Sequence, residues 1–298
     1  MTALHDIDYE IEKQGLVQAF DHVAGSYEQH AILQRTVMER VLERLDLIRL
    51  KAGNVLDLGS GTGLASRLLA QRYKKAQIVQ LDLSSGMLRE SRTRSPRFFS
   101  RQRYLCADAE MLPMADRSID LVFSSLMLQW CNDLDAVFAG AGRVLRPQGL
   151  FIFATLGPDT LKELRLSWEE VDKDMHVNMF LDMHDVGDAL MRAGFDAPVL
   201  DVERFTLTYE DGYKLMRELK DLGAHNVNAG RRRTLTGKNR MQKMLAIYDR
   251  FRQDGRLPAT YEVVYGHAWM VDRSYKTASE DNVVSIPVDS IRRRKGHG

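Results

Sequence analysis

Hydrophobic residues change their spacing along the chain. From about residue 9 to residue 50, apolar positions such as Val37, Val41 and Leu45 recur three or four residues apart with charges between them. This spacing predicts amphipathic helices. From residue 54 onward, short apolar runs alternate with helical patterns. The runs predict strands at 54–59, 77–83, 103–108, 120–126 and 149–156, separated by helices at 62–72, 85–93 and 132–145.

The alternation becomes less regular after residue 156. Helical spacing predicts helices at 161–171 and 182–193, and apolar runs predict two late strands at 198–209 and 259–270. The segment between the late strands predicts two more helices, at 212–222 and 238–252, joined by a stretch rich in glycine, asparagine and arginine. We expect this helical insertion to form a lid over the ligand-binding edge of the sheet.

Strands that alternate with helices predict an α/β fold, in which a doubly wound parallel sheet carries helices on both faces. The carboxyl ends of parallel strands then share one edge, where ligands bind. The expected parts of the chain are N-terminal helices covering a cofactor site (1–50), a core (51–209 and 257–271), a helical lid (210–256) and a disordered tail (272–298).

Composition narrows the function classes. The net charge is +1, so bulk attraction to nucleic acid or to a membrane surface is not expected. The two cysteines, Cys106 and Cys131, suit a reducing compartment and provide no disulfide framework. The sequence has neither an apolar run of about 18 residues nor the apolar segment of a signal peptide. We therefore expect a cytoplasmic protein.

The stretch NVLDLGSGTG (54–63) is typical of a nucleoside-binding turn after a buried strand. Gly59 and Gly61 permit a tight turn with close backbone approach, and Gly63 allows close packing of the following helix. Asp57 would repel a pyrophosphate but attract an ammonium group. S-adenosylmethionine carries an ammonium and a sulfonium but no phosphate, so the turn predicts this cofactor. The alternative is that Asp57 only fixes the loop.

Polar residues also follow the next strands. Asp82 can accept two hydrogen bonds from a ribose diol. Asp108, with the Ala109 backbone beside it, can accept from an adenine amino group. Ser124 or Ser125, at the end of the fourth strand, would face the reacting end of the cofactor. The expected cofactor-binding residues are Asp57, Gly59, Gly61, Gly63, Asp82, Leu83, Asp108, Ala109 and Ser124.

With these features the chain resembles the class I S-adenosylmethionine-dependent methyltransferases, which implies a mostly parallel seven-stranded sheet with one antiparallel strand. More specific stretches are SYEQHAILQR, LMLQWCNDL, VLRPQGLFIFATL and LKDLGAHNVNAGRRRTLTG. They resemble the malonyl-[acyl-carrier protein] O-methyltransferases of biotin synthesis over about residues 14–270. The resemblance implies methylation of the free carboxylate of a malonyl thioester, carried by acyl-carrier protein or coenzyme A. The triple arginine 231–233 and the long tail depart from it.

A malonyl carboxylate needs no general base, because its pKa of about 4 leaves it ionised at neutral pH. The site must instead remove water, align the carboxylate and hold it. The aromatic candidates for such a pocket are Phe20, Tyr27, Trp130, Trp168 and Phe180. Arg231 is the expected cation for the carboxylate and His225 a weaker candidate. Tyr27 and Trp130 are the aromatics expected at the substrate, although either could simply cover the cofactor or belong to the core.

An acidic carrier protein would need a basic surface near the pocket mouth. Two basic sets fit this role. The preferred set lies in the lid, and the other lies around the helix after the fourth strand; a solvated charged loop is the alternative. The lid set is Arg231, Arg232, Arg233, Lys238 and Arg240, and the other set is Arg143 and Arg146.

Three rival functions stay open from the sequence. A methyltransferase for a phenol, quinone or amine would need a base, and the sequence shows no unambiguous one. A related group on the same scaffold is thought to hydroxylate arginine, but no cluster of iron ligands is evident here and no metal is expected. A module that binds the cofactor without chemistry is the third possibility.

Overall fold

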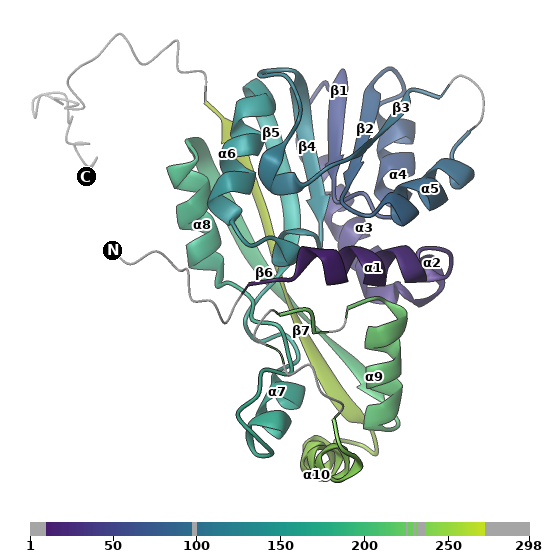
Figure 1. Cartoon of the computed structure of the whole chain (residues 1–298). Helices are drawn as coiled ribbons and strands as arrows, with labels where there is room; N and C mark the ends of the chain where they lie inside the picture. The colour runs from purple at the N-terminus through teal and green to yellow at the C-terminus, as the bar shows by residue number, and fades with distance from the viewer. Residues whose placement is uncertain (1–9, 97–99, 225, 229–230, 232–235, 272–298) are drawn as a thin grey trace, which may run out of the picture.

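One mixed sheet organises the computed structural model, which describes residues 10–96, 100–224, 226–228, 231 and 236–271. The expected disordered tail lies outside the described residues. The seven strands have the order β3-β2-β1-β4-β5-β7-β6 (Figure 1). They are β1 (Asn54–Leu58), β2 (Gln77–Asp82), β3 (Gln102–Cys106), β4 (Ile119–Ser125), β5 (Leu145–Leu156), β6 (Phe195–Tyr209) and β7 (Leu257–Met270).

Strand β7 is antiparallel to both β5 and β6, whereas β1 to β5 pair in parallel. The expectation of a mostly parallel seven-stranded sheet with one antiparallel strand is therefore confirmed. The described helices are α1 (Lys13–Val23), α2 (Tyr27–His30), α3 (Ile32–Asp46), α4 (Leu64–Arg72), α5 (Ser85–Arg94), α6 (Leu134–Val144), α7 (Lys162–Glu169), α8 (Met183–Arg192), α9 (Gly212–Asp221) and α10 (Lys238–Tyr248). Short 3-10 helices are η2 (Ala109–Met111), η3 (Leu128–Trp130) and η4 (Asp249–Phe251).

Alternating residues along the strands divide the apolar core into two layers. Val55 and Leu121 face the side covered by α3 and α4, whereas Leu56 and Val122 face the side covered by α6 and α8. Successive side chains of a strand point to opposite faces, so strands buried on both faces carry nearly continuous apolar runs. Within the described residues, the helices are too short or too polar to span a bilayer.

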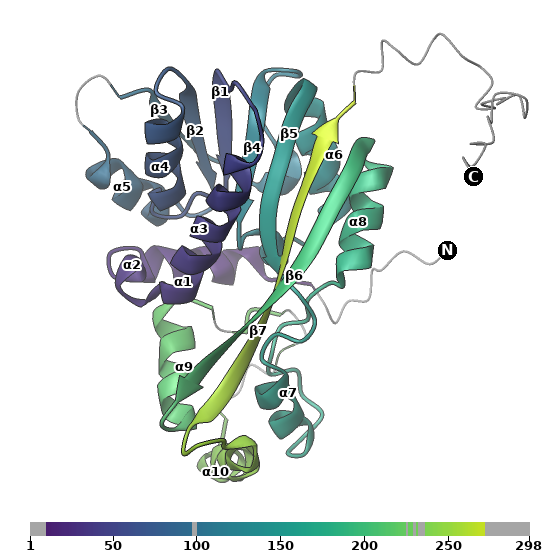
Figure 2. The same cartoon turned by 180° about the vertical axis from the view of Figure 1, so that it is seen from behind.

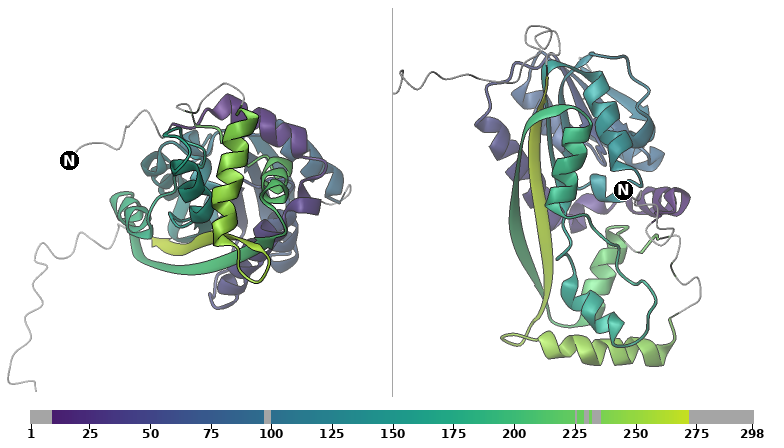
Figure 3. Two further views of the ribbon diagram at one scale, coloured as in Figure 1. Left: turned by 90° about the horizontal axis from the view of Figure 1, so that it is seen from below. Right: turned by 90° about the vertical axis from the view of Figure 1, so that its left-hand side faces the viewer.

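The β6–β7 ribbon projects beyond the rest of the sheet. Strand β5 pairs with β7 between Val263 and Trp269, whereas β6 continues to pair with β7 as far as Leu257. Helices α9 and α10 are carried at the projecting end, and α7 lies beside it (Figures 1 and 2). The view from the side shows α1 and α2 between this lower part and the sheet (Figure 3). The helical insertion between the two late strands is thus present.

Some boundaries differ from the expected ones. Strand β5 begins at Leu145 rather than at residue 149, because α6 ends at Val144 and the chain enters the sheet directly, with Gln148 at a φ of +61°. The N-terminal helical region is interrupted at Ala31, whose ψ of 51° ends α2 before α3 begins. The last expected helix ends at Tyr248 and continues as η4.

Candidate active site

The three glycines after β1 all have the backbone conformation that favours glycine. Their φ angles are +76° at Gly59, +52° at Gly61 and +76° at Gly63. A Cβ at Gly63 would lie 2.0 Å from the Ser91 Oγ, and one at Gly59 would lie 2.2 Å from the Met127 Cγ. At Gly61, in contrast, a Cβ would meet no atom within 4 Å. Two of the glycines therefore serve packing, and Gly61 borders open space.

Asp57 lies at the base of this turn and is only 2% exposed. The Ser66 hydroxyl on α4 donates a 2.5 Å hydrogen bond to its Oδ2. Burial raises the pKa of Asp57 to about 7, although the bond from Ser66 opposes the shift. Asp57 lines a small cavity together with Gly59, Ser60 and Gly61. Its carboxylate is therefore poised to gain from a cation placed in that cavity.

Asp82 ends β2 and faces a larger cavity that adjoins the small one. Its two carboxylate oxygens accept hydrogen bonds from the Gly61 and Ser84 backbone N–H groups, both at 2.8 Å. Burial raises the pKa of Asp82 to about 6, with these N–H groups opposing the shift and Asp21 adding to it. The backbone bonds fix the orientation of the carboxylate and leave lone pairs for a ligand.

Asp108 lies two residues beyond β3 and also lines the larger cavity, as do Leu83 and Ala109. The Lys13 Nζ on α1 contacts the Asp108 Oδ2 at 2.6 Å and the Glu110 Oε2 at 2.7 Å. Burial lowers the pKa of Lys13, but the two carboxylates outweigh burial and raise it overall. The sequence offered no signal for Lys13, because this contact joins residues about 95 positions apart.

The expectation for Ser124 is corrected by the structure. Ser124 is fully buried, and its hydroxyl donates a 2.9 Å hydrogen bond to the Leu58 carbonyl. Ser125, the next residue, points to the other face of β4 and lines both cavities. The alternation of a strand allows only one of two adjacent side chains to face the ligand edge.

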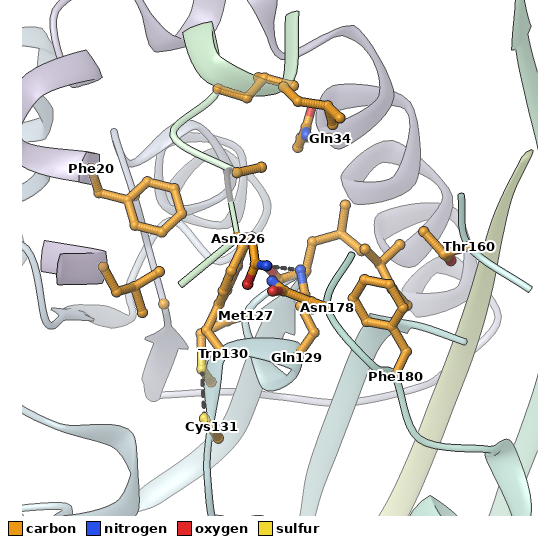
Figure 4. Close-up of a pocket in the computed structure, with 18 of the residues that line it drawn as sticks. Phe20, Gln34, Met127, Gln129, Trp130, Cys131, Thr160, Asn178, Phe180 and Asn226 are labelled. Carbon is orange, nitrogen blue, oxygen red and sulfur yellow. Dashed lines mark hydrogen bonds between the residues drawn. The ribbon is translucent and has the colours of Figure 1, made fainter. Parts of the chain in front are cut away.

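The larger cavity has a volume of about 390 Å³, within the usual range for small-molecule sites. Three parts of the chain line it. The N-terminal helices contribute Leu16 and Phe20, the sheet edge contributes Met127 and Gln129, and helix α9 of the insertion contributes Met216. Figure 4 shows this mostly apolar wall, with a few amide side chains pointing inward. The cavity therefore extends from the glycine turn to the helical insertion between β6 and β7.

All five expected aromatic residues line the larger cavity. Phe20 packs edge to face on Tyr27 and on Trp130, with ring centroids 6.4 and 5.7 Å apart. Trp168 on α7 stacks on His176 with ring centroids 3.7 Å apart. Phe180 lies on the same loop as His176, between α7 and α8. Burial raises the pKa of Tyr27, and the neighbouring Asp82 adds to this effect. Those aromatics were expected at the site, but the stacked His176 was not.

The structure does not place Arg231, the cation expected at the substrate carboxylate, in the cavity. The Arg231 Nη2 contacts the Glu12 Oε2 at 2.8 Å, and its Nη1 donates to the Asn228 carbonyl. It therefore fixes the start of α1 to the lid. His225 lies outside the described residues. Lys220 on α9 lines the cavity instead, and it has no carboxylate partner in the described part of the chain.

Most of the arginines expected to bind a carrier protein are engaged elsewhere. Arg143, in the last turn of α6, pairs with Asp116, and Arg146, at the start of β5, pairs with Asp120. Arg240 pairs with Asp172 and Asp174. Lys238 is exposed at the start of α10. Arg232 and Arg233 lie outside the described residues.

One described group has the ligand spacing of a metal site, which the sequence did not lead us to expect. It comprises Asp172, Asp174 and His176. The His176 Nε2 lies 2.7 Å from the Asp172 Oδ1, and the Arg240 guanidinium contacts both carboxylates at 3.2 and 3.3 Å. The arginine supplies the positive charge between the two acids, so the group acts as an ion-pair network.

Comparison with known proteins agrees with this geometry. A family model described as "Methyltransferase domain" matches residues 56–153, which include the glycine turn, Asp82 and Asp108. A malonyl-[acyl-carrier protein] O-methyltransferase of a Methylovorus species is 53% identical over 266 residues, covering 88% of this chain and 90% of that protein. The chain belongs to the malonyl-[acyl-carrier protein] O-methyltransferase family.

Two further members of this family match most of the chain. The protein of that name from Laribacter hongkongensis is 56% identical, covering 87% of this chain and 89% of that protein. The one from Halorhodospira halophila is 47% identical, covering 96% and 97%. Among solved structures, a putative methyltransferase from Bacillus halodurans superposes with a TM-score of 0.58 at 15% identity, covering 79% of this chain and 99% of that one. That likeness confirms the fold alone.

Proposed function

We propose that this protein transfers a methyl group from S-adenosylmethionine to the free carboxylate of a malonyl group held as a thioester on acyl-carrier protein. The observation that carries the proposal is 53% identity over nearly the whole length of a relative with that name. The joined cavities support it, because the glycine turn and helix α9 both line one continuous, mostly apolar space.

The small cavity suits the ammonium end of the cofactor. Besides Asp57, it is lined by Gln34 and Ser60, whose Oε1 and Oγ are buried and have no hydrogen-bond partner. An ammonium group has three donors and one positive charge, so it would satisfy both acceptors and the Asp57 carboxylate. Along the sheet edge, Asp82 would hold the ribose diol and Asp108 the adenine amino group. When bound, the cofactor supplies an electrophilic methyl group.

The larger cavity suits a substrate that is already ionised. Apolar walls strip water from the carboxylate, and the negative charge is lost as the ester forms, so low polarity favours the reaction. Tyr27, Trp130 and Phe20 provide such walls near the sheet edge. We propose that the Lys220 ammonium holds the carboxylate oxygen that is not methylated, in place of Arg231.

Carrier docking is proposed at the same side of the molecule. Arg217 on α9 and Lys238 on α10 have no carboxylate partners among the described residues. An acidic carrier that approaches the lid would be steered by these unpaired cations. Arg143 and Arg146 do not support this role, because both are engaged in ion pairs.

His176 supports one rival function. It lines the cavity and contacts Asp172 at 2.7 Å, an arrangement that orients an imidazole for proton transfer. A phenol or amine acceptor would use such a base, whereas a malonyl carboxylate would not. The test is incubation of purified protein with labelled methyl donor and malonyl-carrier protein, phenols or amines. We expect label on malonyl-carrier protein that mild alkali removes as methanol. Label on a phenol or amine alone would favour the rival.

A further inference from the structure

A buried amide on the loop between α7 and α8 has an acceptor that the malonyl group does not satisfy. Asn178, on the loop between α7 and α8, lines the larger cavity and is 8% exposed. Its Oδ1 is buried without a hydrogen-bond partner. Leaving such an acceptor unpaired costs free energy, so a ligand that brings a donor to this place is favoured.

The neighbouring amides have their own partners. The Gln129 Nε2 donates to the Leu126 carbonyl at 2.7 Å, and the Asn226 Nδ2 donates to the Met175 carbonyl at 2.5 Å. The Asn226 Oδ1 accepts from the Asn228 N–H. In Figure 4, the side chains of Gln129, Asn178 and Asn226 point toward the same region of the cavity. Asn178 is therefore the member of this group that awaits a donor.

Under the proposed function, the donors of the cofactor are accounted for at other places. Its ammonium, ribose and adenine groups would be held by Asp57, Asp82 and Asp108, which lie at or just after the ends of β1, β2 and β3. Asn178 lies instead with His176 and Phe180 on the lid side of the cavity. The malonyl head offers only acceptors, namely its carboxylate and its thioester carbonyl. The required donor must come from the next part of the substrate.

We infer that the Asn178 side-chain oxygen accepts a hydrogen bond from a secondary-amide N–H of the arm that carries the malonyl thioester. This inference rests on the proposed function, and it makes Asn178 a specificity-determining residue. The thioester arms of acyl-carrier protein and of coenzyme A share such amides, so the contact would select thioesters on this arm against malonyl groups on a plain alkyl chain.

The experiment compares two small substrates of equal chain length, S-malonyl-N-acetylcysteamine, which has one secondary amide, and an S-pentyl malonyl thioester, which has none. For the natural protein we expect a kcat/KM about 10- to 100-fold higher with the amide. In Asn178→Leu, of similar size, that ratio should fall close to one, and the dissociation constant of S-adenosylhomocysteine should not change. Malonyl-carrier protein and malonyl-coenzyme A should both lose activity, which separates the arm from the carrier surface.

Val177→Ala is the matched control, because Val177 is an adjacent buried residue of the same cavity wall without a polar side-chain atom. This variant should lower kcat/KM for both small substrates by the same factor, so the ratio of kcat/KM with the amide substrate to kcat/KM with the alkyl substrate should not change. An equal loss on both substrates in Asn178→Leu, or a ratio near one in the natural protein, would overturn the inference while the proposed function stands. Absence of transfer to any malonyl thioester would contradict the proposed function, and the inference with it.

Discussion

The Ser66 hydroxyl on α4 donates a 2.5 Å hydrogen bond to the carboxylate of Asp57, which lies near the end of β1 at the base of the glycine turn. This bond holds a buried acid whose pKa is raised to about 7, mainly by burial. The acid is ionised above that pH and neutral below it. An ammonium ligand would bind the ionised form.

Affinity for the cofactor should therefore depend on pH. As the pH falls from 8 to 6, Asp57 becomes protonated, and we expect S-adenosylhomocysteine to bind about tenfold more weakly. Asp57→Asn should bind weakly at both values and lose most of this dependence, with a remainder from Asp82. Isothermal titration calorimetry across this range measures both effects. Equal pH dependence in the variant would show that Asp57 does not face the ammonium.

The same substitution should stabilise the protein without cofactor. Because the folded-state pKa of Asp57 is raised, the folded protein prefers the protonated acid, and its stability falls as the pH rises from about 4 to 7. Asp57→Asn removes this penalty. We expect the free energy of unfolding to increase by about 1–3 kcal/mol at pH 8 and by much less at pH 5. Urea denaturation at the two pH values tests this, and an unchanged or lower stability at pH 8 contradicts it.

Glycine substitutions in the turn should separate packing from ligand contact. Gly63→Ala meets Ser91 and a positive φ, so we expect a loss of several kcal/mol of stability. Gly61→Ala meets only the positive φ and should cost about 1 kcal/mol. Because Gly61 lines both cavities, its variant should nevertheless bind cofactor more weakly. Thermal melts with and without cofactor report both quantities; equal destabilisation by the two variants would contradict the distinction.

Lys220 and Arg231 provide a matched pair of cation substitutions. Lys220→Met should raise the KM for malonyl-carrier protein about 10- to 100-fold, because the substrate carboxylate loses its charge partner. Arg231→Met should change KM by less than about threefold, because its guanidinium contacts Glu12 rather than the cavity. Steady-state kinetics with both variants decide which residue holds the carboxylate, and the reverse order of effects would return that role to Arg231.

His176 tests whether the reaction needs a base. His176→Asn should retain kcat for malonyl-carrier protein within about fivefold, with a flat pH profile of kcat between 6 and 9, because the acceptor is already ionised. A loss of more than about a hundredfold, together with a profile that rises with pH in the natural protein, would assign His176 to proton transfer. The rival with a phenol or amine acceptor would then be preferred.

The sheet and most elements could be predicted because each strand is a short apolar run bounded by turn residues, and because helical spacing is local information. The start of β5 could not be predicted in this way. Leu145 joins the sheet because it pairs with Ile119, and this contact between distant residues is not visible in the sequence. The sequence also allowed us to predict which positions would lie along the ligand edge of the sheet. The three glycines, Asp57, Asp82 and Asp108 each lie at or near the end of a strand, and strand ends are local features of the sequence.

The substrate side of the site was less predictable, because it is assembled from segments far apart in the sequence. Ser124 and Ser125 could not be separated before the facing of β4 was known. Arg231 lies in a basic run, which says nothing about its contact with Glu12. Lys220 lies in the stretch LKDLGAHNVNAGRRRTLTG, which carries part of the family resemblance, but nothing in that stretch distinguishes it from the arginines that follow. Such assignments depend on the lid geometry rather than on local pattern.

The most direct test of the account is the intact mass of two carrier proteins after incubation with the enzyme and S-adenosylmethionine. Malonyl-carrier protein should gain one methyl group, and acetyl-carrier protein, which lacks the second carboxylate, should gain none. Transfer to both carriers, or to neither while the cofactor still binds, would contradict methylation of the malonyl carboxylate.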